Sequence, residues 1–478
     1  MITENCTPRE VFRIFEEYCG LPHPSHYTEA ATAFCLRFAE EHGLAAVRDT
    51  AGNVVIRKPA SAGREHLPTV ILQGHLDMVA EKDPDCEIDF LKDGLSLFLD
   101  GDLLGARGTT LGGDNGIAVA MALAILADDT LPHPALEVVF TTDEEVGMLG
   151  ADAMDMSALR GKYLLNLDSE EEGVLTVSCA GGATATITYP ATRQAYTGHT
   201  VTATFNGMQG GHSGAEIHRG RANAARMAAE LVAAVAGVCE VRLLSLDGGL
   251  KDNAIPARAV CRFVVSDPHA AKEASLAFAD RARAIYATAD PGLTITFEEE
   301  IATGKAFSLT DTANILSLLT TIPCGVQKMS EDIAGLVQTS LNLGILETNE
   351  QGIHAVYSVR SSVSKEKDEL LATMQKTATA LGATYTVAGA YPAWEYRKEC
   401  PLRETVLATY RRLWGKDMRV EAIHAGLECG LFSDRIAGLY CVSLGPNMQD
   451  IHTPRERLSV SSVNRTYEFV KEILKEIS

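Results

Sequence analysis

Two adjacent glutamates, Glu144 and Glu145, follow the apolar run ALEVVF in the segment TTDEEVG. Like charges this close repel each other, so their proximity calls for a positive partner. A divalent metal ion is such a partner, because carboxylates bind it directly and its charge offsets theirs. One glutamate can then bind metal, while its neighbour takes a proton from water as a general base.

Other potential metal ligands follow apolar runs that indicate strands. His75 and Asp77 follow the run VILQG, and Asp168 ends the run KYLLNLD. Asp114 lies in the loop RGTTLGGDNG, and His452 lies in DIHTP beyond the run LYCVSLG. Functional groups gather beyond the carboxyl ends of strands in open α/β sheets. We therefore expect these residues to share one small volume.

Imidazole and carboxylate groups together favour a borderline divalent ion, and zinc suits them well. One ion needs about three or four such ligands, so five candidates with one bridging carboxylate fit two ions, roughly 3.5 Å apart. Asp77 is two residues from His75 and can hold the second nitrogen of its imidazole. Each segment alone is typical of an ordinary turn or strand end, and only their joint occurrence predicts a metal site.

The elements that must position these residues change character along the chain. Residues 1–182 alternate strand-like and helix-like segments, the pattern of a mostly parallel α/β sheet. Residues 183–388 contain period-two strands and helices that indicate an α+β unit, with LVQTSLNLGILE and IHAVYSVRSSV as paired strands. The α/β pattern returns at 389–478. The simplest prediction is one α/β domain in two parts, interrupted by an inserted domain.

Composition limits the cellular setting and the partners. The 478 residues include 42 Lys and Arg against 63 Asp and Glu, a formal net charge of −21. This balance argues against nucleic acid and anionic membrane surfaces as partners. The N-terminus shows no signal-peptide pattern, and the longest apolar run, 117–126, is too short to span a bilayer. Eleven scattered cysteines without a C-x-x-C pair fit a reducing compartment, so we expect a cytoplasmic protein.

Seven segments together resemble the dinuclear-zinc exopeptidases related to aminoacylase and carboxypeptidase G. These segments are GHLDMV, GGDNGIAVAMAL, TTDEEVGMLGA, NLDSEEEG, GGHSGAEIHRGRANA, DNAIPARA and IHTPRERLSV. The similarity extends over essentially the whole chain and is greatest to the aminoacyl-histidine dipeptidase branch (Xaa-His dipeptidase, peptidase D). It implies a zinc-exopeptidase-like α/β fold, a mostly parallel sheet with helices on both faces that is interrupted by an inserted α+β lid domain.

The resemblance also implies how the ligands divide between two zinc ions. His75 and Asp168 match the ligands of one ion, and Glu145 and His452 match the ligands of the other. Asp114 matches the carboxylate that bridges both. Cobalt or manganese would accept the same ligands.

The implied activity is metal-dependent hydrolysis of dipeptides, preferentially Xaa-His peptides such as carnosine, by a water that bridges the two metals. Glu144 matches the general base of this reaction, and Asp77 matches the residue that orients the first histidine. Asn115 departs from the wider superfamily, which often has a lysine or glutamate after the bridging aspartate. Asparagine at this position fits the dipeptidase branch.

The inserted domain is implied to act as a lid and as the surface of a homodimer. His212 in GGHSG matches a lid histidine that stabilises the tetrahedral intermediate, in some members from the partner subunit. Asn253 in DNAIP and Arg360 in YSVRSS match residues that hold the carboxylate end of the substrate. Gly426 in HAGLECG matches a backbone contact to the small peptide substrate.

Three other interpretations stay open on the sequence. A related di-zinc tripeptidase, N-acyl amino acid deacylase or carboxypeptidase would use the same metal site and differ only in its substrate pocket. A non-catalytic metal-binding homologue would be expected to have lost a ligand or the base, yet every candidate is present. A purely structural role for the polar cluster would predict no tightly bound metal.

Overall fold

The structure, a computed structural model, describes residues 2–478 and divides into two compact units. Unit 1 runs to Cys179 and includes Tyr396–Ala422 and Leu427–Ser478. Unit 2 comprises Ala180–Glu395 and Ile423–Gly426. The expected insertion at 183–388 lies inside the first of these segments, and the second segment of unit 2 was not expected.

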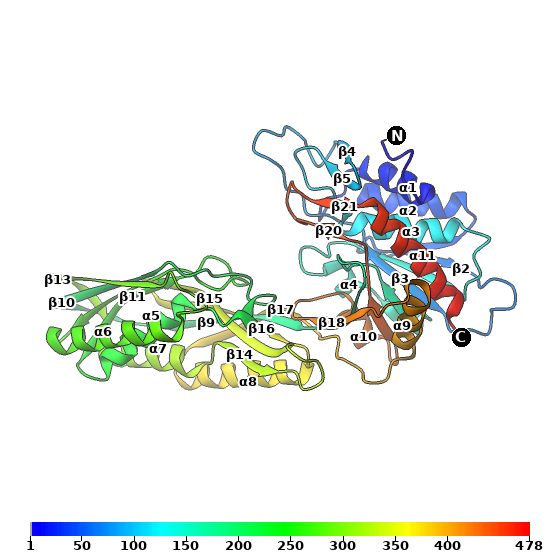
Figure 1. The fold of residues 1–478 in the computed structure, drawn as a ribbon. Helices are drawn as coiled ribbons and strands as arrows, with labels where there is room; N and C mark the ends of the chain where they lie inside the picture. The colour runs from blue at the N-terminus through cyan, green and yellow to red at the C-terminus, as the bar shows by residue number, and fades with distance from the viewer. Residues whose placement is uncertain (1) are drawn as a thin grey trace. The chain divides into compact units, whose positions relative to one another are not determined.

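Unit 1 is built on an eight-stranded sheet (Figure 1). Its strands are, in spatial order, β1 (Ala45–Arg48), β2 (Val54–Lys58), β6 (Leu136–Thr141), β3 (Val70–His75), β7 (Tyr163–Asn166), β19 (Tyr440–Ser443), β8 (Val174–Cys179) and β18 (Arg419–Ile423). The central strands β6, β3, β7 and β19 run parallel, whereas β1 and β2 on one side and β8 on the other pair antiparallel. The predicted α/β class is confirmed, with a parallel centre and antiparallel margins.

Strands β3 and β6 are buried along their whole length, which explains their continuous apolar runs. Helices pack against both the central and the outer strands: α3 contacts β3, α2 contacts β1 and β2, and α9 and α10 contact β19. The helices of unit 1 are α1 (Arg9–Cys19), α2 (Glu29–Glu41), α3 (Gly113–Ala127), α4 (Leu149–Ala153), α9 (Pro401–Trp414), α10 (Cys429–Arg435) and α11 (Val460–Glu476). A small antiparallel sheet adds β20 (Met448–Gln449), β21 (Arg457–Ser459), β5 (Leu103–Ala106) and β4 (Leu97–Asp100).

Unit 2 is a nine-stranded antiparallel sheet with helices along one side (Figure 1, green to yellow). Its strands are, in spatial order, β13 (Thr294–Phe307), β10 (Arg193–Asn206), β12 (Ala259–Val265), β11 (Val241–Gly248), β15 (Val337–Asn349), β16 (Gly352–Ser361), β9 (Gly181–Pro190) and β17 (Thr384–Tyr391), and β14 (Gly325–Met329) also pairs with β15. The predicted pairing of β15 with β16 is confirmed. The helices are α5 (Ala224–Ala236), α6 (Pro268–Ile285), α7 (Leu309–Thr321) and α8 (Ser364–Ala380).

The core of unit 2 lies between its sheet and its helices. Alanine-rich α5 is the central helix of this layer, because it contacts α6, α7 and strands β11, β12 and β15. Its small side chains allow close approach to the sheet, and most of them are fully buried. Within residues 2–478, no helix has the length and apolar character needed to cross a membrane.

Candidate metal centre

The polar side chains singled out in the sequence follow the carboxyl ends of parallel strands. His75 is the last residue of β3, Asp168 lies two residues beyond β7, and Glu144 and Glu145 lie just beyond β6. Parallel strands end at the same edge of a sheet, so these side chains gather there. Asp114 joins them from the start of α3, where its backbone is not yet helical.

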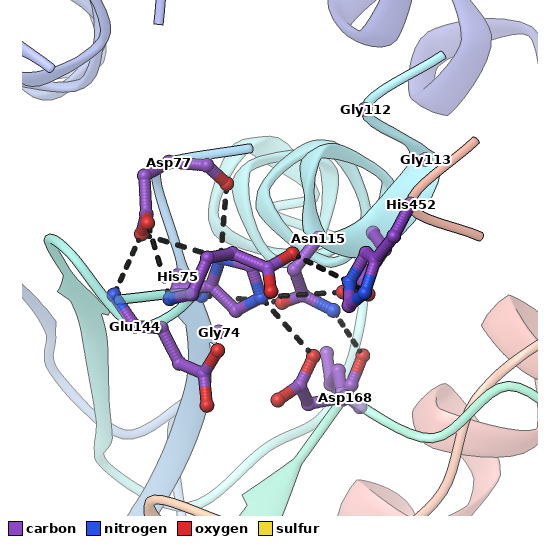
Figure 2. A network of polar contacts seen from close by, with 12 residues as sticks. Gly74, His75, Asp77, Gly112, Gly113, Asn115, Glu144, Asp168 and His452 are labelled. Carbon is purple, nitrogen blue, oxygen red and sulfur yellow. Dashed lines mark hydrogen bonds and ion pairs between the residues drawn. The ribbon is translucent and has the colours of Figure 1, made fainter. Parts of the chain in front are cut away.

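Two groups of potential ligands share Asp114, and Figure 2 shows three of their members, His75, Asp168 and His452. In the first group, Nε2 of His75 lies 3.2 Å from Oδ1 of Asp114 and 3.4 Å from Oδ1 of Asp168. In the second, Nε2 of His452 lies 3.2 Å from Oδ2 of Asp114 and 2.9 Å from Oε1 of Glu145. The ligand atoms of each group lie within 4.8 Å of one another. Asp114 thus offers one oxygen to each group, as a bridging ligand must.

The chemistry of this donor set fits two divalent cations. Two imidazoles and three carboxylates are the ligand types of borderline metals, and three negative charges balance most of the four positive charges that two such ions carry. Hydrogen bonds to Asp114 and Glu145 raise the pKa of His452 to about 11. Burial, together with nearby Asp114 and Glu145, raises the pKa of Asp168 to about 6. The His452 shift, and the part of the Asp168 shift that Asp114 and Glu145 cause, reflect a group of close carboxylates that favours positive charge among them.

Glu144 stands apart from both ligand groups. Its carboxylate belongs to neither set, although it follows the same strand as Glu145. Burial raises the pKa of Glu144 well above its ordinary value, and the carboxylates of Asp168 and Glu145 raise it further. A half-buried carboxylate with an increased proton affinity beside a metal site is suited to accept and return a proton.

Asp77 does more than the sequence indicated. The Nδ1 atom of His75 lies 3.0 Å from the backbone oxygen of Asp77 and 3.4 Å from its carboxylate, which leaves Nε2 free to bind metal. The same carboxylate accepts the backbone N–H groups of Glu144 at 2.9 Å and Glu145 at 3.2 Å, and the hydroxyl of Ser25 at 2.8 Å. Asp77 therefore holds both the first histidine and the glutamate pair.

Asn115 ties three elements of the site together. Its Oδ1 accepts the backbone N–H of His75 at 3.2 Å (Figure 2), and its Nδ2 donates to the carbonyl of Leu167 at 2.9 Å. The asparagine is fully buried, and the peptide bond that joins it to Asp114 is cis. Both polar atoms of the Asn115 amide are used, which accounts for a short amide side chain directly after Asp114.

Three buried polar residues next to the candidate ligands, Gln73, Asn166 and Glu428, were not predicted from the sequence. Gln73 and Asn166 lie two residues before His75 and Asp168, and the amide of Asn166 donates to Oε1 of Gln73 at 2.6 Å. Gln73 in turn donates to the buried carboxylate of Glu428, whose pKa burial raises to about 8. The available signal was a polar residue inside each apolar run, Gln in VILQG and Asn in YLLN.

The four residues expected to contact substrate all lie in unit 2. A Cβ atom on Gly214 would be 3.0 Å from Cε1 of His212 and 3.1 Å from Nε of Arg360, so these two side chains flank that glycine. Arg360 donates to the hydroxyl of Tyr391 at 3.2 Å, and a Cβ on Gly426 would meet the ring of the same tyrosine.

Asn253 joins this group through the backbone, because its carbonyl accepts the N–H of Ser213 at 2.8 Å. The structure therefore brings together within unit 2 the residues that the sequence placed 41 to 214 positions apart in GGHSG, DNAIP, YSVRSS and HAGLECG. The Nδ1 atom of His212 accepts the backbone N–H groups of Gly214 and Ala215 at 3.1 and 3.0 Å. Burial lowers the pKa of His212, so the ring is neutral near pH 7 and carries its proton on Nε2.

An α/β domain that collects histidines and carboxylates beside a free glutamate has the arrangement of a metal-dependent hydrolase. The chain belongs to peptidase family M20/M25/M40, whose family model matches residues 71–476. It is therefore a peptide-bond hydrolase, and the resemblance seen in the sequence is confirmed.

Individual relatives cover nearly the whole chain. It is 36% identical over 476 residues to the cytosol non-specific dipeptidase of Escherichia coli (strain K12), with 98% of each chain covered. The crystal structure of aminoacylhistidine dipeptidase from Vibrio alginolyticus matches with a TM-score of 0.94 at 33% identity, covering 99% of this chain and 98% of that one. Aminopeptidase PepT from Bacillus cereus ATCC 10987 shares the fold, with a TM-score of 0.56 at 16% identity over 99% of each chain.

Proposed function

We propose that this protein is a dipeptidase that hydrolyses short peptides, preferentially Xaa-His, with two divalent ions, zinc foremost and cobalt or manganese as alternatives. The observation that carries the proposal is the pair of ligand groups that share Asp114, beside a glutamate that belongs to neither. Two relatives that cover nearly the whole chain are a non-specific dipeptidase and an aminoacylhistidine dipeptidase, which supports dipeptides as substrates.

Each ion would be held by three protein ligands. His75, Asp114 and Asp168 would hold one, and Asp114, Glu145 and His452 would hold the other. When bound, two such ions polarise the scissile carbonyl and lower the pKa of water toward neutrality. Their positive charge also resolves the repulsion between the paired glutamates.

Glu144 supplies the proton transfers. Its carboxylate takes a proton from the water that attacks the carbonyl carbon, and the resulting carboxylic acid gives the proton to the leaving amine. Asp77 fixes the backbone of Glu144 through a 2.9 Å hydrogen bond and so keeps the base in place.

In this proposal, unit 1 is the catalytic domain and unit 2 is the lid, which also forms a homodimer as the family resemblance implies. Nε2–H of neutral His212 is suited to donate to the developing oxyanion. Arg360 would bind the carboxylate of the substrate, with Asn253 and the backbone of Gly426 as further contacts. A cytoplasmic location fits the free thiols of all eleven cysteines.

Replacing Arg360 with lysine is expected to raise KM for dipeptides about 10- to 100-fold with a smaller change in kcat, because a bidentate charge-assisted contact becomes a single one. In the wild-type chain, Nε of Arg360 is buried and has no hydrogen-bond partner within residues 2–478, so this atom is available to a ligand. Steady-state kinetics on alanyl-histidine would measure the change. Arg262→Lys, an exposed arginine of the same unit, is the matched control, and equal KM values in both variants would contradict the assignment.

The first test of the proposal is hydrolysis of β-alanyl-histidine and a dipeptide panel, before and after chelation and with each metal restored. We expect cleavage that chelation abolishes and zinc, cobalt or manganese restores, with the highest kcat/KM on Xaa-His. Matched N-acetyl amino acids and tripeptides serve as controls in the same assay.

Three outcomes of this panel separate the alternatives. Equal rates across dipeptides would keep the dipeptidase and remove the histidine preference. Cleavage of only tripeptides or N-acyl amino acids would keep the chemistry and overturn the substrate class. No metal-dependent hydrolysis of any compound would favour a non-catalytic metal-binding protein.

A further inference from the structure

Glu456 is a buried carboxylate that no part of the proposed reaction uses. Only 2% of its surface is exposed, and both of its oxygens face the loop before α3. Oε2 accepts the backbone N–H groups of Leu111 at 2.7 Å and Gly112 at 3.1 Å. Oε1 accepts those of Gly113 at 2.8 Å and Asp114 at 3.3 Å. One side chain thus receives four consecutive backbone donors.

This arrangement fixes the backbone that carries the bridging ligand. The loop 111–114 contains two glycines, and Gly112 has a left-handed backbone, so the loop has little conformational preference of its own. Four hydrogen bonds to one carboxylate restrict that freedom. They also give the first N–H groups of α3, which lack partners inside the helix, an acceptor from a distant part of the chain.

Glu456 also belongs to the segment that carries His452. Its own N–H donates to the carbonyl of Thr453 at 3.0 Å, and the hydroxyl of Thr453 donates to the carbonyl of Asp450 at 2.8 Å. The turn 450–456 is therefore braced internally, with His452 inside it. Because Glu456 anchors this turn to the loop of Asp114, one residue sets the position of the two ligands relative to each other.

We propose that Glu456 is a positioning residue. It fixes the positions of Asp114 and His452 relative to each other and thereby increases the affinity of the site for its metal ions. The inference rests on the two-metal function proposed above. Groups that orient metal ligands from outside typically contribute 10- to 100-fold in metal affinity or activity, and we expect an effect of that size here. The ion between Asp114, Glu145 and His452 should be affected most, because two of its three ligands depend on Glu456.

Glu137 provides a control for a purely structural role. It is also a buried carboxylate of unit 1, 3% exposed, and it accepts the backbone N–H groups of Arg160 at 2.8 Å and Gly161 at 3.0 Å. It lies at the start of β6, at the opposite end of that strand from Glu144. Replacing either Glu137 or Glu456 should lower the free energy of unfolding, but only the replacement of Glu456 should change the affinity for metal.

The experiment compares Glu456→Gln, Gly113→Ala and Glu137→Gln with the wild-type full-length chain. Glutamine keeps the shape of Glu456 but turns an N–H group toward two of the four backbone donors. Alanine at 113 keeps the charge of Glu456 and displaces it, because the new Cβ would lie 3.0 Å from Oε1. Zn²⁺ is titrated in a chelator-buffered series with metal per chain measured by mass spectrometry. Visible absorption of the Co²⁺-loaded protein and melting temperatures are recorded in parallel.

We expect wild type and Glu137→Gln each to bind two ions, and the affinity for each ion should be the same in the two proteins. We expect Glu456→Gln to bind the weaker ion 10- to 100-fold less tightly, with an altered Co²⁺ spectrum and a lower kcat at similar KM. Gly113→Ala, which keeps every polar group, should shift affinity in the same direction. If both variants fold and titrate as Glu137→Gln does, the positioning role is overturned while the metal centre stands. If wild type itself binds no metal, the two-metal function fails, and this inference fails with it.

Discussion

Replacing Glu144 with glutamine is expected to lower kcat on dipeptides by about 10²- to 10⁴-fold, the usual contribution of a general acid–base group. Metal content and fold should be unchanged, because the Glu144 carboxylate belongs to neither ligand group and its backbone N–H still reaches Asp77. Glutamine has the same shape but cannot accept the proton of the attacking water. Turnover, metal per chain and melting temperature of the purified variant together measure this outcome.

A matched control for Glu144→Gln is Glu171→Gln, which alters an exposed glutamate paired with Arg419 in the same unit. This control should retain full turnover. Substantial residual activity in Glu144→Gln, with two ions bound, would refute its role as the base. Loss of metal together with activity would instead mark Glu144 as a ligand, which the geometry does not support.

Replacing Asp114 with alanine should remove both ions at once. Asp114 is the one residue common to the two ligand groups found within residues 2–478, with one oxygen directed at each histidine. Its loss leaves each site with two protein ligands, fewer than a stable site needs. Because bound metals provide several kcal/mol of transition-state stabilisation, kcat/KM should fall about 10³-fold or more.

The comparison with single-group variants makes this prediction specific. His75→Ala removes a ligand of the first group only, and His452→Ala removes a ligand of the second group only. Each should therefore retain more metal than Asp114→Ala at the same free Zn²⁺ concentration. Asp417→Ala, at an exposed aspartate of unit 1, controls for loss of a carboxylate. Retention of one tightly bound ion in Asp114→Ala would show that this residue does not bridge.

The centre of the sheet and the ligands at its edge could be predicted from the sequence for a physical reason. Parallel strands buried on both faces need largely apolar runs, and VIL in β3 and VVF in β6 are such runs. A polar residue at or just beyond the end of such a run lies at the carboxyl edge of the sheet, where functional groups gather. His75 and Glu144 were located in this way without knowledge of which strand pairs with which.

The limits of the inserted unit could not be predicted in the same way. Residues 423–426 belong to unit 2 because the backbone N–H of Ala180 lies 3.2 Å from the carbonyl of Ile423 and 3.0 Å from that of Ala425. Hydrogen bonds between segments more than 240 residues apart leave no local pattern in composition or periodicity. Gly426 was singled out through resemblance, and its place beside Tyr391 emerges only in three dimensions.

The sequence by itself determined the family, the candidate ligands with their order along the chain, and the candidate base, because each depends on residue identity and on short-range patterns. Only the tertiary structure decided that Asp114 gives one oxygen to each group, that Asp77 holds His75 and the glutamate pair together, and that Glu456 fastens the loop of Asp114. These are relations between groups brought close by folding, and hydrogen bonds and metal coordination depend on distance in space. Separation along the chain carries no information about them.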